Sequence, residues 1–142
     1  MTDSSPGQGQ PRGPALTVDG VLVEDGSVLL VRRRNPPFAG RYALPGGFVD
    51  YGETVEAAAA REVQEETGLA VAVERLIGVY SDPKRDPRGH TVSVAFLVRH
   101  RCGTLAGADD ADEARFFPLD ALPALAFDHD HILADARALL AG

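Results

Sequence analysis

The sequence predicts one α/β domain in which helices pack on a mixed β-sheet. Two apolar, β-branched segments at residues 15–23 and 27–33 flank a Glu-Asp-Gly turn, which predicts a hairpin. An Ala- and Glu-rich segment without Gly or Pro then predicts a helix, and further strands and a second helix follow it. Because these elements do not alternate as regular βαβ units, a mixed α/β sandwich is favoured over a doubly wound parallel sheet.

The most clearly marked element is the helix expected at residues 54–67. Val55, Ala59 and Val63 recur every four residues and form the stripe that should be buried. Gly68 follows as the residue that ends the helix. We therefore expect this helix to lie with its apolar face on the sheet.

The other elements follow from apolar patterns separated by Pro- and Gly-rich loops. Strands are expected at residues 42–44, 70–80, 90–99 and 114–118, and a last helix at residues 128–140. Loops are expected at residues 35–40 and 81–89. No internal repeat interrupts this order.

Length and composition limit the number of domains that the chain can form. With 142 residues and 44% hydrophobic content, there is material for one compact domain but not for a second module such as a helix-turn-helix. We expect residues 1–14 to be a disordered leader rather than a signal peptide, and residues 15–142 to form the domain. The apolar runs fall far short of the roughly 20 residues that a membrane span needs, so no membrane partner is expected.

The net charge and the cysteine content limit the classes of ligand and the cellular compartment to be expected. The formal net charge of −7 argues against binding DNA or RNA through a basic surface, because such binding neutralises many phosphates with Lys and Arg. A nucleotide substrate would also be repelled unless clustered carboxylates bring divalent cations into the site. Cys102 is the single cysteine and cannot form an internal disulfide, so the expected compartment is the cytoplasm.

The segment that points to chemistry runs from residue 47 to residue 69. On the predicted helix, Glu62, Glu65 and Glu66 are related by i+3 and i+4, so three carboxylates share one face. A solvated helix edge, with Arg61 paired to Glu65, is the plainer interpretation. Three like charges repel one another, however, and a purely structural helix gains nothing from that repulsion. Mg²⁺ prefers oxygen ligands, so the pattern indicates a metal site.

The same segment resembles the Nudix box at every defining position. Its fixed residues and two aliphatic positions are Gly47, Glu53, Arg61, Glu62, Val63, Glu65, Glu66, Gly68 and Leu69. The box also lies between a short strand and the helix that it contains, as it does in that family. The resemblance covers most of the chain from Ala15 onward and implies the family's α/β/α sandwich with a mixed sheet.

The resemblance implies a set of metal ligands. Glu62 and Glu66 would be the principal ligands of Mg²⁺, for which Mn²⁺ is an alternative. Glu65 would complete the cluster directly or through water, and the backbone carbonyl of Gly46 would reach the same ion. The implied reaction is hydrolysis of the diphosphate bond in a nucleoside diphosphate linked to another group.

Further catalytic roles follow for residues in and after the box. In the family, the residue at Glu53 supports the site by hydrogen bonding, whereas Arg61 either orients a glutamate or only holds the box together as an ion pair. The reaction needs a group that takes the proton of the attacking water, for which a carboxylate is suited, and the candidates in the box are Glu62 and Glu65. The candidates beyond it are Asp109, Asp110, Asp112 and Glu113. We favour Glu113, although a solvated acidic loop is the plainer interpretation.

Stretches outside the box resemble the ADP-ribose pyrophosphatase branch of the family. They begin at Arg32, Gly78 and Leu125, and Pro83 lies close to the place of a proline associated with that branch. ADP-ribose would be cut to AMP and ribose 5-phosphate. Homodimers are common in this branch, but the sequence leaves the oligomeric state open.

Residues for binding the substrate are sought first among the arginines, whose forked donors suit phosphate. The candidates are Arg33, Arg41, Arg85 and Arg88. Each of them is otherwise a surface arginine. His129 either bonds a ribose or base, or is a partly buried histidine beside a helix-capping Asp128.

Two other functions stay open at this point. A nucleoside triphosphate pyrophosphohydrolase, such as one that clears oxidised nucleotides, would use the same box and release pyrophosphate. A non-catalytic Nudix domain would sense a nucleotide and regulate a partner. Its usual signs are lost box glutamates or an attached DNA-binding domain, and the sequence shows neither, which favours an enzyme.

Overall fold

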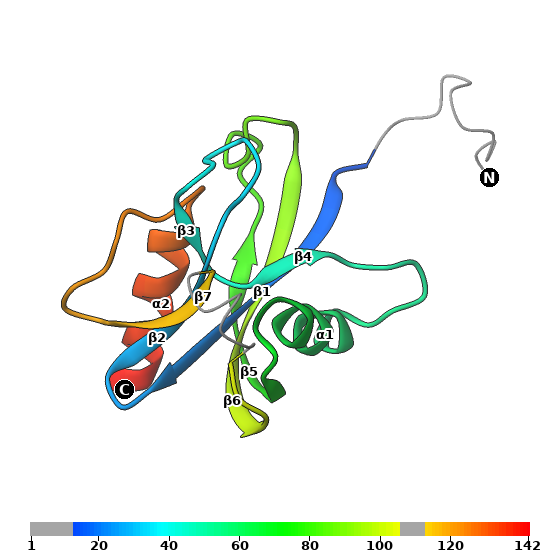
Figure 1. Ribbon diagram of the computed structural model, residues 1–142. Helices are drawn as coiled ribbons and strands as arrows, with labels where there is room; N and C mark the ends of the chain where they lie inside the picture. The colour runs from blue at the N-terminus through cyan, green and yellow to red at the C-terminus, as the bar shows by residue number, and fades with distance from the viewer. Residues whose placement is uncertain (1–12, 106–112) are drawn as a thin grey trace, which may run out of the picture.

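A computed structural model describes residues 13–105 and 113–142 (Figure 1). The elements in chain order are β1 (Ala15–Glu24), β2 (Ser27–Arg32), β3 (Tyr42–Ala43), β4 (Gly46–Phe48), α1 (Val55–Thr67), β5 (Ala70–Tyr80), β6 (Thr91–Cys102), β7 (Ala114–Pro118) and α2 (His129–Ala141). The expected strands and helices are all present, although β6 continues past its expected end at residue 99. Nearly all of the expected leader, residues 1–12, lies outside the described residues.

The strands of the described residues form one mixed sheet of seven, with the main order β3-β2-β1-β6-β5. β4 pairs with β1, and β7 pairs with β2. β1 and β6 run parallel, from Ala15 opposite Thr91 to Leu22 opposite Val98, whereas the other strand pairs are antiparallel. This parallel pair places two strands from distant parts of the chain at the centre of the sheet.

The two faces of the sheet bury separate hydrophobic cores. The core beneath α1 includes Val18, Leu22, Phe96, Val98, Ala58, Ala59 and Val63. The core beneath α2 includes Val21, Ala95, Leu97, Ile132, Leu133 and Ala136. Because successive side chains of a strand point to opposite faces, the one-residue offset between the two sets puts the helices on opposite sides (Figure 1). The expected α/β/α sandwich with a mixed sheet is therefore confirmed.

α1 begins and ends with the local signals expected of a helix. The side chain of Thr54 accepts a hydrogen bond from Ala57 N at 3.1 Å, and Gly68 adopts the left-handed conformation with φ of 83°. Between these ends, Ala58, Ala59 and Val63 are buried on the sheet. In the described part of the chain, no helix is long and apolar enough to cross a membrane.

β4 is the one strand that the sequence did not predict. It contains Gly46 and Gly47 directly after a proline, and glycine and proline are both unfavourable in strands. It exists because its backbone pairs with β1, with Val18 opposite Gly47 and Asp19 opposite Gly46. The pairing brings a backbone without side chains next to α1.

Replacing Gly20 by Ala tests how closely α1 packs on β1. The added Cβ would lie 2.8 Å from Val63 Cγ2, and overpacking of this kind costs about 1–3 kcal/mol. We expect Gly20→Ala to lower the free energy of unfolding by about that amount in urea titrations. Combined with Val63→Ala, it should cost less than the sum of the two single changes, because the clash is then absent.

Gly13→Ala serves as the control, because an added Cβ there meets nothing within 4 Å. It should change stability by less than about 0.5 kcal/mol. Strictly additive costs for Gly20→Ala and Val63→Ala would contradict the packing described above.

Candidate active site

Glu62 and Glu66 lie together where α1 faces β4. Burial raises the pKa of Glu66 to about 9, with further contributions from a hydrogen bond with Glu62 and from its negative charge. A hydrogen bond from the Gly46 backbone opposes this rise. A Cβ on Gly47 would lie 2.5 Å from Glu62 Oε2, so only a glycine lets β4 approach the carboxylates this closely.

This arrangement fits a divalent cation. A proton shared by two carboxylates offsets their repulsion, and a hard cation could take its place. In the residues that the structure describes, no group of three or more His, Cys, Asp or Glu side chains could hold a metal ion by itself. Mg²⁺ usually binds through one or two carboxylates and completes its shell with water and substrate phosphate oxygens. The Glu62–Glu66 pair therefore suits it.

Arg61 connects the helix to the loop before it. Its Nε and Nη2 atoms donate to the two carboxylate oxygens of Glu53 at 2.7 and 2.9 Å. Its Nη1 atom donates to Glu62 at 3.1 Å and to Glu65 at 3.2 Å, and Nη2 also bonds the carbonyl of Phe48 at 3.1 Å. The hydrogen bonds from Arg61 lower the pKa of Glu53 to about 2. Arg61 thus both contacts a box glutamate and holds the segment together.

Two other predicted acids, Glu65 and Glu113, form ion pairs with arginines. The side chain of Glu65 is 57% exposed and pairs with Arg61. The carboxylate of Glu113 forms two hydrogen bonds with the guanidinium of Arg34, which lower its pKa. Like Glu62, neither residue lines the cavity described next, whereas Glu66 does. The remaining acids of that cluster, Asp109, Asp110 and Asp112, lie outside the described residues.

A cavity of about 320 Å³ opens beside Glu66, a size that suits a small-molecule site. Its walls come from β1, β2, β4, the loop of residues 81–90 and the start of α2. Polar and charged side chains that line it include Asp19, Arg33, Glu66, Arg85, Asp86, Arg88 and His129. Basic and acidic groups from distant segments thus meet in one space.

Arg33, Arg88 and Phe127 form the cationic part of this cavity. The Cζ atoms of Arg33 and Arg88 lie 4.8 and 5.7 Å from the centroid of the Phe127 ring. Burial lowers the pKa of Arg33, and the neighbouring charge of Arg88 lowers it further. Asp86 pairs with Arg88 at 2.8 Å. An anion bound next to the two guanidinium groups would relieve their repulsion.

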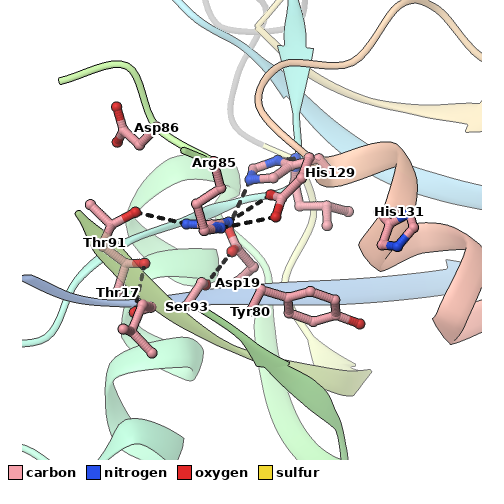
Figure 2. A network of polar contacts seen from close by, with 12 residues as sticks. Thr17, Asp19, Tyr80, Arg85, Asp86, Thr91, Ser93, His129 and His131 are labelled. Carbon is pink, nitrogen blue, oxygen red and sulfur yellow. Dashed lines mark hydrogen bonds and ion pairs between the residues drawn. The ribbon is translucent and has the colours of Figure 1, made fainter. Parts of the chain in front are cut away.

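Arg85 stabilises the wall of the cavity through its hydrogen bonds. Its side chain is only 5% exposed and donates to both carboxylate oxygens of Asp128, at 2.9 and 2.7 Å. Its third interaction is with Thr91 Oγ1 at 2.8 Å, which Figure 2 shows. The guanidinium therefore ties the loop of residues 81–90 to the start of α2.

Arg41 and His129 differ in their relation to the cavity. Arg41 is exposed, lies with its Cζ 5.5 Å from the Phe38 ring centroid, and is not among the lining residues. His129 does line the cavity, but its Nδ1 accepts a hydrogen bond from Leu44 N at 3.0 Å. Asp128 precedes α2 without capping it through a side-chain hydrogen bond, so the capping role expected for it is not seen.

The sequence interpretation missed several residues of the cavity. Asp19, Asp86 and Phe127 line it, and Ser93, which does not line it, is buried and donates a hydrogen bond to Asp19. A signal existed for Asp19, because it interrupts the apolar segment at residues 15–23, where an acid is rare unless it has partners. No comparable local signal marks Ser93.

The low pKa of Glu53 predicts a stability change in acid. The carboxyl has an ordinary pKa of 4.5 and a folded value of about 2, so its contribution is present above about pH 4.5 and is lost as the pH falls toward 2. We expect Glu53→Gln to unfold at a lower temperature than wild type at pH 7, with a difference that shrinks between pH 4.5 and 2. Circular dichroism melts measure this. Glu56→Gln, on the exposed first turn of α1, is the control, and a pH-independent difference would contradict the assignment.

Comparison with known proteins agrees with the geometry. A curated ADP-ribose pyrophosphatase of Methanocaldococcus jannaschii is 55% identical over 122 residues, which are 86% of this chain and 72% of that protein. The NUDIX domain of Shewanella oneidensis NrtR, crystallised with ADP ribose, superimposes with a TM-score of 0.73 at 30% identity, covering 91% of this chain and 90% of that one.

A further structure holds both a nucleotide and a metal. The bifunctional NMN adenylyltransferase/ADP ribose pyrophosphatase of Francisella tularensis, complexed with AMP and a Mn ion, has a TM-score of 0.73 at 26% identity. This match covers 89% of the chain and 42% of that protein. Residues 13–136 match the NUDIX domain family. The chain is therefore a member of the NUDIX family of hydrolases.

Proposed function

We propose that this protein hydrolyses the diphosphate bond of ADP-ribose to give AMP and ribose 5-phosphate, with a divalent cation bound at Glu62 and Glu66. The observation that carries the proposal is that Glu66, which is hydrogen-bonded to Glu62, lines a cavity that Arg33 and Arg88 also line. Such a cavity offers both a place for cations and donors for phosphate oxygens. A diphosphate is the group that needs both.

The chain's own residues hold and orient the reacting groups. A bound Mg²⁺ or Mn²⁺ would supply positive charge to the diphosphate oxygens and make water a stronger nucleophile. Glu62 and Glu66 would hold it, with the Gly46 backbone beside them. Arg61 would keep Glu62 in place while Glu53 fixes the guanidinium of Arg61. The Gly46 carbonyl remains a proposed ligand.

Other residues would receive the substrate. Arg33 and Arg88 would bind the phosphate oxygens that face away from the cation. Arg85 would act through the shape of the wall, since its side chain is buried and held by Asp128 and Thr91, whereas that of Arg88 is half exposed. Glu65 and Glu113 both stay candidates for accepting the proton of the attacking water. Each carboxylate would first have to leave an arginine, Arg61 for Glu65 and Arg34 for Glu113.

The choice of ADP-ribose rests on relatives as well as on the cavity. The similar protein from Methanocaldococcus jannaschii bears the name ADP-ribose pyrophosphatase, and the similar NrtR domain was crystallised with ADP ribose. We also propose a cytoplasmic location, because the sequence has a single cysteine. Homodimer formation stays a prediction.

Substrate preference is the first test. We expect the purified protein with Mg²⁺ to cleave ADP-ribose faster than dinucleotides or nucleoside triphosphates, as the similarity to a protein named ADP-ribose pyrophosphatase suggests. Chromatography of the products should show AMP and ribose 5-phosphate in equal amounts. A preference for triphosphates of about tenfold or more in kcat/KM, equivalent to about 1.4 kcal/mol, would overturn the substrate assignment.

Glu66→Gln is the second test. With a pKa of about 9, Glu66 carries a proton at neutral pH when no cation is bound, and glutamine has nearly the same shape as that neutral form. We expect the variant to fold with an unchanged Tm and to lose at least about 100-fold in kcat, because a metal ligand is missing. Glu56→Gln, on an exposed helix position, is the matched control and should keep full activity. Undiminished turnover in Glu66→Gln would refute the metal site.

A further inference from the structure

We propose that Ser93, Asp19 and His129 form a buried relay that positions the backbone of residues 44–47 beside Glu62 and Glu66. The three side chains come from β6, β1 and the start of α2, and Figure 2 shows Asp19 and Ser93 below the guanidinium of Arg85 and His129 beside it. The inference rests on the proposed function for the identity of the ion at Glu62 and Glu66, but the relay itself is a feature of the fold.

Asp19 is the centre of the relay. It is only 5% exposed, in the middle of β1, where an ionised carboxylate is unfavourable unless polar groups surround it. The hydroxyl of Ser93 donates to Asp19 Oδ2, and His129 Nε2 lies 3.5 Å from Asp19 Oδ1. Both carboxylate oxygens are therefore faced by a polar group from another element.

The ring of His129 has a defined orientation and tautomer. Its Nδ1 accepts a hydrogen bond from Leu44 N at 3.0 Å, so the ring proton of a neutral histidine is on Nε2 and faces Asp19. Burial of the ring lowers the pKa of His129, which keeps it neutral. A neutral ring with one acceptor and one donor connects Asp19 to the backbone of Leu44.

The relay contacts the segment at two places. His129 holds its first residue, Leu44, through the backbone N–H. Farther along, a Cβ on Gly46 would lie 2.6 Å from Asp19 Oδ1, so the carboxylate packs directly against this glycine. Gly47, the next residue, lies against Glu62. A shift in the relay would thus move the backbone that borders both carboxylates.

This role is one of positioning. Binding groups must be held to within about 0.5 Å of their working geometry, and hydrogen-bonded groups behind them provide that support. An apolar trio of similar volume would fill the same space, but it would not fix the direction of the Leu44 N–H. The relay would therefore affect cation binding and turnover more than the affinity for nucleotide.

The test uses two substitutions of His129 and a matched control. His129→Leu removes both ring nitrogens, whereas His129→Asn places an amide oxygen near the former Nδ1 and again offers Leu44 N an acceptor. Thr67→Val is the control, since it removes a buried hydroxyl that bonds Val63 and Leu69 rather than the segment. All three variants are expected to lower the Tm.

Three measurements separate positioning from stability. They are the amide ¹⁵N–¹H shifts of Gly46 and Gly47 without metal, Mn²⁺ affinity by electron paramagnetic resonance, and kcat and KM for ADP-ribose. We expect His129→Leu to move both amide signals and to lower Mn²⁺ affinity and kcat by about 10–100-fold, with KM changed less than about twofold. His129→Asn should recover most of each loss, and Thr67→Val should change only the Tm.

The outcomes also separate this inference from the proposed function. If folded His129→Leu keeps the wild-type amide shifts, Mn²⁺ affinity and kcat, the relay is refuted while ADP-ribose hydrolysis stands. If the wild-type protein does not cleave ADP-ribose, the proposed function is refuted. The relay still stands in that case if His129→Leu lowers the Mn²⁺ affinity and shifts the amide signals of Gly46 and Gly47. Should His129→Leu fail to fold, Ser93→Ala, which removes one partner of Asp19, decides the question by the same measurements.

Discussion

The repulsion between Glu62 and Glu66 is the interaction on which the rest of the site depends. Two carboxylates in a partly buried position need a proton or a cation to offset their charge, and burial together with Glu62 accordingly raises the pKa of Glu66 to about 9. The packing of the surrounding elements holds the two carboxylates close together. α1 packs on β1 through Val63, and the side-chain-free backbone of Gly46 and Gly47 covers the carboxylates from β4.

Charge around this pair is divided between fixed and accessible groups. Arg61 is committed to Glu53, Glu62 and Glu65, and Arg85 is committed to Asp128 and Thr91. These arginines stabilise the box and the cavity wall. Arg33 and Arg88 meet over Phe127, and Asp86, which pairs with Arg88, offsets only part of their repulsion, so they gain from a bound anion. A chain with a net charge of −7 can in this way attract a phosphate locally.

Strained backbone also occurs near the cavity. Phe38 and Phe127 both adopt positive φ angles, 64° and 53°, and their rings meet edge to face at 4.9 Å. Non-glycine residues rarely adopt this conformation, and such strain gathers where function constrains the chain. Phe127 lines the cavity and immediately precedes Asp128 and His129. The strained backbone therefore lies next to the residues that form the cavity wall and the relay.

Local sequence determined the hairpin, α1 with its caps, and the row of glutamates, because periodicity and turn residues act over a few positions. It did not predict β4, since Gly46 and Gly47 become a strand only by pairing with β1. Nor did it show that Glu113 meets Arg34, that Arg85 is buried against Asp128, or that His129 bonds Leu44. These contacts join residues far apart in the chain, so their partners are set by sheet register and helix packing, which only the tertiary structure decides.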